Sequence, residues 1–443
     1  MQRKLLPFYL VSLLYLLWVW WIGNVWFLLG LPVIFDMMVT RYVPWFFWKK
    51  RENKKYISTP LSFWIDAIVI ALATAVFIRL FFFEAYTIPT SSMSKTLLPG
   101  DYIFVSKLHY GPKRPRTPIA LPFVHNKMPF TNNVPSYSKK VIWPYKRLAG
   151  FSRIKRNEII VFNFPEGDTV VPNFQGQNYY TLIREYGRDY IVNNFDIITP
   201  PVDKMEYFIK RCIALPGDTL EIMHGDVFIN KQRQKPLPSF QYNYFIKTLS
   251  GKLSDSIFRN YGIYPADVRY NKYSSLYEIP LTKEDVSHFS SLNEVINMSK
   301  YENTYGAFAT KSIFPYSSYY SWTEDNFGPI VIPEKNKKVQ LSLQNLPLYK
   351  RIITAYENNT LHISNDSIYI NGTFAPDYVF RKDYFFVMGD NRHNSSDSRF
   401  WGFVPEDHIV GKAILVWLSV NRENEQDNKI RWNRVFKPIK SLH

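Results

Sequence analysis

The stretch IDAIVIALATAVFIRLFFFEAYTIPTSSM, residues 65–93, decides how this chain is organised. Its first part, residues 65–83, is apolar except for Asp66 near its start and Arg79 near its end, and it is long enough to cross a bilayer as a helix. Its last part places Ser92 shortly after that run. The stretch predicts a membrane helix followed at once by a serine-containing segment, and a buried helix of a soluble domain is the alternative.

The residues before this stretch predict further membrane structure. Residues 5–35 contain no charged side chain, which is longer than one span requires and too long for a cleavable signal peptide. We expect Gly30 and Pro32 to end a span and residues 33–48 to lie at the membrane interface. A tight helical hairpin is the alternative.

A basic loop sets the expected orientation of the chain. The positive-inside rule predicts that a loop rich in lysine and arginine is cytoplasmic. The residues after position 83 are then expected on the outer side of the membrane. The basic residues of this loop are Lys49, Lys50, Arg51, Lys54 and Lys55.

Composition narrows the class of partner. The net charge of +17 over 443 residues suits an anionic surface, either lipid headgroups or nucleic acid. Because the sequence contains no nucleic-acid-binding motif, we expect the bilayer as the partner, with plain solubility as the alternative. The single cysteine, Cys212, excludes an internal disulfide and is expected to be a buried, inert thiol. The histidines form no metal-binding motif, so we expect neither a metal nor another cofactor.

Beyond residue 83 the chain is expected to be mainly β. Runs of β-branched and aromatic residues at 101–106, 158–164, 384–388 and 409–419 predict strands. Residues 111–157, which are rich in proline, lysine and tyrosine, predict an extended ribbon.

A near-repeat predicts a large insertion. Residues 219–230 and 360–371 both begin Thr-Leu-x-Ile and end, at the same spacing, in an aromatic residue, isoleucine and asparagine. Both are predicted to be β-hairpins separated by an insertion of about residues 231–359, and chance similarity is the alternative. Within the insertion we expect helices near 282–292 and 348–356, the first with a capping box formed by Thr282 and Asp285.

Three boxes carry candidate catalytic residues. The first, IPTSSM at 88–93, contains Ser92, and the second, YFIKR at 207–211, contains Lys210. The third, GDNRHNSSDSRFWGFVP at 389–405, is too dense in polar and glycine residues to be a strand and predicts a loop held by its own hydrogen bonds. A serine becomes a nucleophile when a neighbouring base removes its proton, and a desolvated lysine can be that base.

Together, in this order and behind two apolar segments, the boxes closely resemble bacterial type I signal peptidase, also called leader peptidase, a Ser–Lys dyad family. The resemblance covers about residues 84–218 and 380–420. It implies a membrane-bound serine endopeptidase that removes N-terminal signal peptides from exported preproteins. It also implies a multi-pass protein of the bacterial inner membrane whose catalytic domain lies on the outer, periplasmic side. Signal peptides and the bilayer are the expected partners, nucleic acid is not, and a link to the protein-export machinery stays open.

The resemblance implies a role for each matching residue. Ser92 matches the nucleophile, and Lys210 matches the general base. Thr90 falls where the family uses a hydroxyl, together with the backbone N–H of Ser92, to hold the oxyanion. The supporting residues are Ser395, which matches a serine that orients the lysine, and Asp397 and Arg399, which match an ion pair beneath the site.

The lysine must be neutral to act as a base, and desolvation among apolar groups lowers its pKa. Phe208, Ile209, Ile213 and Leu215 are expected to supply that apolar setting.

Substrate choice is expected to follow from shallow apolar pockets that accept small residues at positions −1 and −3 of the signal peptide. The strands before Ser92 and Lys210 can bind the substrate as an added β-strand. In the resembling family the pocket residues would be Ile88, Pro89, Met93, Leu97, Ile103, Phe208 and Ile209, and plain core packing is the alternative role of each.

These inferences divide the chain into a mainly β, membrane-anchored protein with an inserted α+β cap. We expect an N-terminal membrane segment and basic cytoplasmic loop at 1–60 and a transmembrane helix at 61–84. The catalytic core is expected in two parts, 85–222 and 376–422. The cap domain is delimited as 223–375, and a basic C-terminal tail as 423–443.

Two features depart from the family pattern. Lys95 stands where proline is common, which creates a Ser-x-x-Lys at 92–95, the spacing of penicillin-binding proteins and β-lactamases. The prolines at 89 and 99 leave little room for the helix that this reading needs, and neither Lys-Thr-Gly nor Ser-Asp-Asn occurs. The second departure is the size of the insertion, and a catalytically inactive membrane scaffold is the rival from another functional class.

Overall fold

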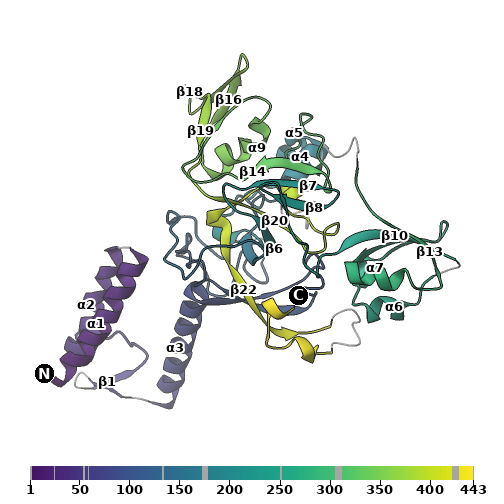
Figure 1. The fold of residues 1–443 in the computed structure, drawn as a ribbon. Coiled ribbons are helices and arrows are strands. Elements are labelled where there is room, and N and C mark those ends of the chain that lie inside the picture. The colour runs from purple at the N-terminus through teal and green to yellow at the C-terminus, as the bar shows by residue number, and fades with distance from the viewer. Residues whose placement is uncertain are drawn as a thin grey trace.

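The computed structural model describes residues 2–23, 25–52, 55–57, 59–131, 134–171, 178–249, 252–304, 312–421 and 429–442. Its N-terminal helices extend from one side of a β-rich body (Figure 1). The N-terminus and the small hairpin of β1 (Lys50–Glu52) and β2 (Lys55–Ile57) lie at the end of these helices that is farthest from the body.

The N-terminal segment is a helical hairpin. Helix α1 (Gln2–Ile22) ends at Gly23, and the chain returns through a 3-10 turn (Val25–Leu29), α2 (Gly30–Phe35) and a π-helical turn (Asp36–Thr40). The prediction that Gly30 and Pro32 end the span is therefore wrong, and the hairpin alternative is confirmed.

Two glycines explain where this hairpin turns and how closely it packs. Gly23 has a φ of +63°, a conformation that favours glycine. The ring of Tyr15 packs directly on Gly30, and a side chain at position 30 would collide with it. The Tyr15 hydroxyl then donates to the carbonyl of Phe27 at 2.6 Å, which ties the two arms together.

Helix α3 (Pro60–Phe81) begins at Thr59, which forms a capping box with Ser62. Among the residues of α3, only Ser62 and Phe81 are buried, so α3 is not the core helix of a soluble domain. Two described helices, Leu5–Ile22 and Pro60–Phe81, are long and apolar enough to cross a membrane.

The main sheet is antiparallel, and its strands run in the order β21-β20-β6-β5-β22-β4-β3, with β23 paired to β22. The four strands expected from the sequence are confirmed as β4, β5, β20 and β22. This agrees with the expected mainly β, membrane-anchored fold. The strands are β3 (Phe83–Thr87), β4 (Asp101–Ser106), β5 (Ile159–Asn163), β6 (Tyr207–Ala214), β20 (Tyr384–Met388), β21 (Val404–Pro405), β22 (Ile409–Ser419) and β23 (Lys437–Pro438).

Between β6 and β20 the chain forms smaller sheets and short helices. One sheet has the order β14-β7-β8-β9, and another has the order β11-β12-β10-β13 with α6 and α7 beside it (Figure 1). The strands are β7 (Thr219–Met223), β8 (Asp226–Ile229), β9 (Gln232–Arg233), β10 (Tyr242–Thr248), β11 (Arg269–Asn271), β12 (Leu276–Leu281), β13 (Val295–Lys300), β14 (Phe327–Val331), β15 (Lys338–Gln340), β16 (Leu361–Ser364), β17 (Ser367–Ile370), β18 (Thr373–Phe374) and β19 (Asp377–Val379). The helices between β6 and β20 are α6 (Asp255–Asn260), α7 (Lys283–Phe289) and α9 (Leu346–Arg351), the last continued by a π-helical turn (Ile352–Tyr356). Helices α4 (Tyr179–Tyr186) and α5 (Arg188–Asn194) come earlier, between β5 and β6.

The near-repeat corresponds to two hairpins closed in the same way, β7–β8 and β16–β17. The Asn230 side chain accepts from the Thr219 N–H at 2.9 Å, and the Asn371 side chain accepts from the Thr360 N–H at 2.9 Å. The hairpin prediction is confirmed, and so is the Thr282–Asp285 capping box at α7.

Two connecting segments also pack on the sheet. The ribbon from 111 to 157 is extended and pairs with itself only at isolated bridges within its described residues, such as Lys113 with Arg147. The described end of the expected basic tail, residues 429–442, folds back on the core: β23 pairs with β22, and Arg434 binds the buried Asp101 at 2.6 Å.

Candidate active site

Ser92 and Lys210 meet although they lie 118 positions apart in the sequence. Ser92 lies in the turns that follow β3, and Lys210 lies within β6, which is held between β5 and β20. The two side-chain atoms, Lys210 Nζ and Ser92 Oγ, are 2.6 Å apart, and both residues are buried. This is the contact that a base needs in order to take a proton from a nucleophile.

The environment of Lys210 favours a neutral amine. Burial lowers the pKa of Lys210 from its ordinary value of 10.5 to about 8, and the carboxylates of Asp397 and Asp390 oppose the shift. The ring of Phe208 lies 5.8 Å from Nζ and forms part of the apolar setting expected from the sequence. A substantial fraction of the amine is therefore unprotonated in mildly alkaline solution.

Asp397 and Arg399 form a buried ion pair at the start of α10 (Ser398–Trp401), a short helix within the box expected to be a loop, which also contains β21. The Arg399 guanidinium donates to both oxygens of Asp397, at 2.9 and 2.8 Å. Asp397 also accepts from the N–H of Gly389 at 3.0 Å, so the pair fixes the loop where it leaves β20. The pKa of Asp397 is lowered even though burial opposes this, because Arg399 lies beside it.

The groups expected to bind the oxyanion lie in the serine segment, residues 88–95, which follows β3 and contains Ser92. Thr90 is exposed, and Ser92 is buried. Within the described part of the chain, neither the Thr90 hydroxyl nor the Ser92 N–H has a hydrogen-bond partner. Ser395 Oγ is buried and has no hydrogen-bond partner among the described residues; no bond to Lys210 is formed.

The expected pocket residues fall into two groups. Ile88, Met93, Leu97 and Ile103 belong to a buried cluster in which the last three have no exposed surface, so core packing accounts for them. The residues that keep exposed surface are Pro89, Phe208 and Ile209.

A second buried ion pair joins β6 to the third box, residues 389–405, which is called the polar loop below. The sequence analysis missed this pair. Arg211 donates to both oxygens of Asp390 at 2.7 and 2.6 Å, and Thr96 Oγ1 donates to Asp390 at 2.6 Å. Successive residues of a strand point to opposite faces, so Lys210 can face the serine while Arg211 anchors the loop behind it. The adjacent Lys210 and Arg211 were the sequence feature from which this second ion pair could have been expected.

Lys95 points away from the serine. Its Nζ donates to the carbonyl of Tyr261 at 2.6 Å and pairs with Asp285 at 3.0 Å. The segment 92–95 forms turns and no helix. The Ser-x-x-Lys reading therefore has no geometric support.

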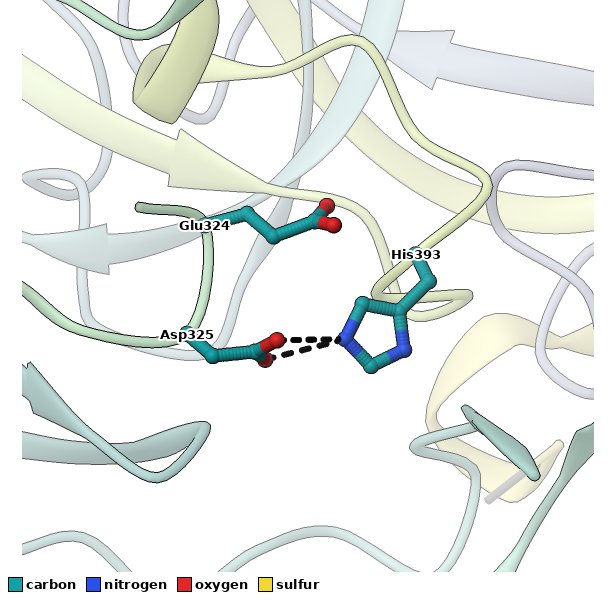
Figure 2. Close-up of side chains that lie close together, drawn as sticks. All are labelled: Glu324, Asp325 and His393. Atoms are coloured by element: carbon teal, nitrogen blue, oxygen red, sulfur yellow. Dashed lines mark hydrogen bonds and ion pairs between the residues drawn. The ribbon is translucent and has the colours of Figure 1, made fainter. Parts of the chain in front are cut away.

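Glu324, Asp325 and His393 form a cluster with metal-ligand chemistry (Figure 2), and their polar atoms lie within 4.8 Å of one another. The backbone N–H of Asn243 donates to Nδ1 of His393 at 2.9 Å, so Nε2 carries the ring proton. Nε2 donates to Asp325 at 2.9 Å. Both ring nitrogens are thus used, and the ring has no free lone pair for a metal ion in this arrangement.

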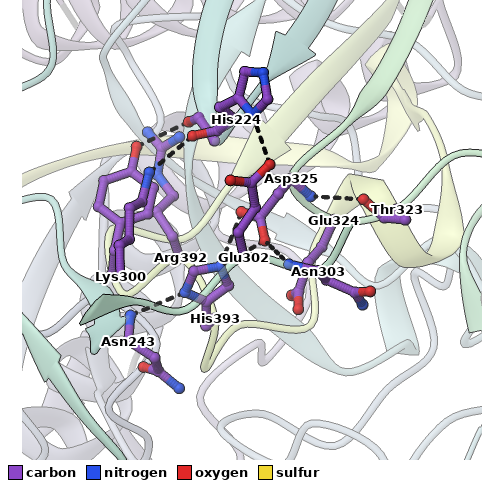
Figure 3. Close-up of polar contacts among 12 residues, drawn as sticks. His224, Asn243, Lys300, Glu302, Asn303, Thr323, Glu324, Asp325, Arg392 and His393 are labelled. Atoms are coloured by element: carbon purple, nitrogen blue, oxygen red, sulfur yellow. Dashed lines mark hydrogen bonds and ion pairs between the residues drawn. The ribbon is translucent and has the colours of Figure 1, made fainter. Parts of the chain in front are cut away.

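The same cluster attaches the polar loop to the segment between β6 and β20 (Figure 3). Asp325 accepts from the N–H of Asn303 at 2.9 Å, and the Glu324 carbonyl accepts from Arg399 at 3.2 Å. We read the cluster as structural.

Comparison with known proteins agrees with this geometry. A sequence model of the family described as "Signal peptidase, peptidase S26" matches residues 61–252 and 377–418. The chain is 23% identical to signal peptidase I of Buchnera aphidicola subsp. Baizongia pistaciae over 388 residues, 87% of this chain and 84% of that protein. It is 25% identical to signal peptidase I of Helicobacter pylori over 392 residues, 86% and 92% of the two chains. Signal peptidase I of Aquifex aeolicus is 26% identical over 360 residues, 80% and 83% of the two chains. Because the matched segments make up more than half of the chain and contain all three boxes, the chain belongs to the signal peptidase family, peptidase S26.

Proposed function

We propose that this chain is a membrane-bound serine endopeptidase that removes signal peptides from exported preproteins, with Ser92 as nucleophile and Lys210 as general base. The observation that carries the proposal is the 2.6 Å contact between Lys210 Nζ and Ser92 Oγ in a buried setting. The relatives that cover most of the chain are named signal peptidase I, which supports the substrate class.

The reaction follows from this geometry in two halves. Ser92 Oγ attacks the carbonyl carbon before the cut while neutral Lys210 accepts its proton, and the carbonyl oxygen becomes an oxyanion held by Thr90 and the N–H of Ser92. Lys210 then gives the proton to the departing amine as the C–N bond breaks. Water then attacks the ester carbonyl while Lys210 takes its proton, and Lys210 returns this proton to Ser92 Oγ as the ester C–O bond breaks and the carboxylic acid product leaves.

We further propose a topology with the catalytic unit outside the membrane. The turn of the N-terminal hairpin contacts the ribbon of residues 111–157, because Lys146 Nζ donates to the Gly23 carbonyl at 3.4 Å and the rings of Phe27 and Trp143 are 6.1 Å apart. The end of α3 joins the same contact through Phe81. The N-terminus and the basic loop lie at the opposite end (Figure 1), where the positive-inside rule puts the cytoplasm.

The decisive experiment compares single variants on one preprotein whose signal peptide ends in alanine at −3 and −1. Ser92→Ala and Lys210→Ala should each lower cleavage by about a thousandfold or more, because either change removes the nucleophile–base pair. Lys95→Ala should lower cleavage far less than either of these changes, since Lys95 Nζ contacts Tyr261 and Asp285 and can act only by positioning its segment. Cleavage by Lys210→Ala together with its loss in Lys95→Ala would overturn the assignment, and full cleavage by Ser92→Ala would point to an inactive scaffold.

A further inference from the structure

The segment between β6 and β20 reaches back to the nucleophile. The unit formed by β10 to β13 with α6 and α7 contacts the serine segment at two places, through Asp267 and through Asp285. Asp267 closes a short helical turn (Pro265–Asp267) between α6 and β11. These contacts join residues far apart in the chain, since 176 positions separate Asp267 from Ser91.

Asp267 joins the two segments that surround the nucleophile. Ser91 Oγ, from the residue directly before the nucleophile, donates to Asp267 Oδ1 at 2.7 Å. Asn391 Nδ2, from the polar loop, donates to Asp267 Oδ2 at 3.0 Å. One carboxylate thus accepts from both segments at once.

Asn391 completes the connection to the nucleophile itself. Its backbone N–H donates to the carbonyl of Ser92 at 3.1 Å, and its side chain also donates to the carbonyl of Ser91 at 3.3 Å. The peptide units on both sides of the Ser92 Cα are therefore held by Asn391, whose side chain is in turn held by Asp267.

Lys95 supplies a second attachment to the same unit. Its ion pair with Asp285 and its hydrogen bond to the Tyr261 carbonyl fix the chain three residues after the nucleophile. Lys95 adopts a φ of +68°, which is unusual for a residue other than glycine and is maintained by these contacts.

We propose that Asp267 is a positioning residue for the acyl-transfer reaction: by holding Ser91 and Asn391, it keeps the Ser92 hydroxyl against Lys210. Attack by a serine depends on alignment within about 1 Å, and a displacement of that size can cost about a hundredfold in rate. This inference rests on the proposed function and gives the inserted unit a part in catalysis, through the two residues that flank the reacting pair.

The test is a set of variants of the full-length protein in detergent, assayed on a preprotein substrate. Asp267→Ala should lower kcat by about 10- to 100-fold with KM within about twofold of the parent, because alignment and not substrate binding is lost. Asp267→Asn should restore most of kcat, since its amide oxygen still accepts from Asn391 and its NH2 group can donate to the Ser91 hydroxyl. Glu284→Ala, an exposed change on α7 of the same unit, is the matched control and should behave as the parent.

Ser91→Ala removes the same hydrogen bond without changing the inserted unit, so it keeps the test valid even if Asp267→Ala fails to fold. Its kcat should fall, and adding Asp267→Ala should lower kcat by less than the product of the two single effects. Parent-like kcat in Ser91→Ala, or a raised KM with unchanged kcat in Asp267→Ala, would overturn the inference. Inactivity of the parent, or full activity of Ser92→Ala, would instead overturn the proposed function.

Discussion

At the scale of single residues, the proposed reaction depends on the proton of Lys210. Because burial lowers the pKa of this amine to about 8, its neutral form increases as the pH rises through that value. We therefore expect kcat/KM to rise about tenfold per pH unit below pH 8 and to level off above it. The measurement is kcat/KM on a preprotein between pH 6 and pH 10. A rate that stays constant from pH 6 to pH 9 would contradict a lysine base.

The same shift predicts how stability depends on pH. The folded pKa of Lys210, about 8, lies below its ordinary value of 10.5, so between these values the unfolded chain binds more protons and stability rises with pH. The loss of folding stability that comes from burying protonated Lys210 is about 3 kcal/mol, and it is fully present below pH 8. The stability advantage of Lys210→Met over the parent should therefore be larger at pH 7 than at pH 10.5 by about this amount.

Thermal unfolding of the two proteins at both pH values measures that difference. Constant terms, such as the hydrogen bond that Ser92 loses in Lys210→Met, cancel when the two pH values are compared. An advantage that does not change with pH would contradict the shifted pKa.

Sequence reasoning predicted that Ser92 and Lys210 meet and that Asp397 pairs with Arg399, but it did not predict the contacts of Asp267. Ser92 and Lys210 lie in boxes whose order can be read along the chain. Asp267 lies in a segment without a motif, and its contact with Ser91 exists only after the inserted unit folds back on the serine segment. For Met93 the sequence allowed two roles, because an apolar residue beside a nucleophile can line a substrate pocket or pack in the core. The structure shows that its side chain is fully buried.

At the scale of elements, the buried pair Arg211–Asp390 joins β6 to the loop that carries Asp397. Asp390→Ala would leave a fully buried guanidinium without its carboxylate, which costs about 3–5 kcal/mol. We expect a large fall in the thermal unfolding temperature together with loss of cleavage. Asp226→Ala is the control, because its partner Arg233 is 61% exposed and such pairs contribute about 1 kcal/mol or less. Equal stability losses in the two variants would contradict the role of the buried pair.

Elements with their own local signals were predictable. Strands β20 and β22 are runs of β-branched and aromatic residues with clear ends, and the two similar hairpins are closed by asparagine side chains that the repeat preserves. The N-terminal hairpin was only one of two alternatives, because residues 5–35 carry no charged side chain that would separate one span from two, and Gly23 was not recognised as the turn. The close packing of Gly30 on Tyr15, which fixes the return of the chain, is a tertiary contact.

At the scale of the whole molecule, the helices and the catalytic unit form one arrangement. The turn at Gly23 and the end of α3 both pack against the ribbon of residues 111–157. Both points therefore lie at the end of the N-terminal helices that faces the β-rich body, which contains Ser92. The N-terminus and the basic loop lie together at the opposite end of these helices (Figure 1). In the proposed topology, in which the hairpin crosses the bilayer twice and α3 crosses it once, the candidate active site faces the region where the signal peptide of an exported preprotein leaves the membrane.

Cysteine labelling tests this arrangement, because the native Cys212 is fully buried and gives little background. Val25→Cys, at the exposed turn of the hairpin, and Asp255→Cys, on exposed α6, should react with a membrane-impermeant maleimide in intact spheroplasts. Lys50→Cys in the basic loop should react only after the membrane is permeabilised. Protection of Val25→Cys together with labelling of Asp255→Cys would show that the hairpin does not cross, and labelling of Lys50→Cys in intact spheroplasts would reverse the proposed orientation.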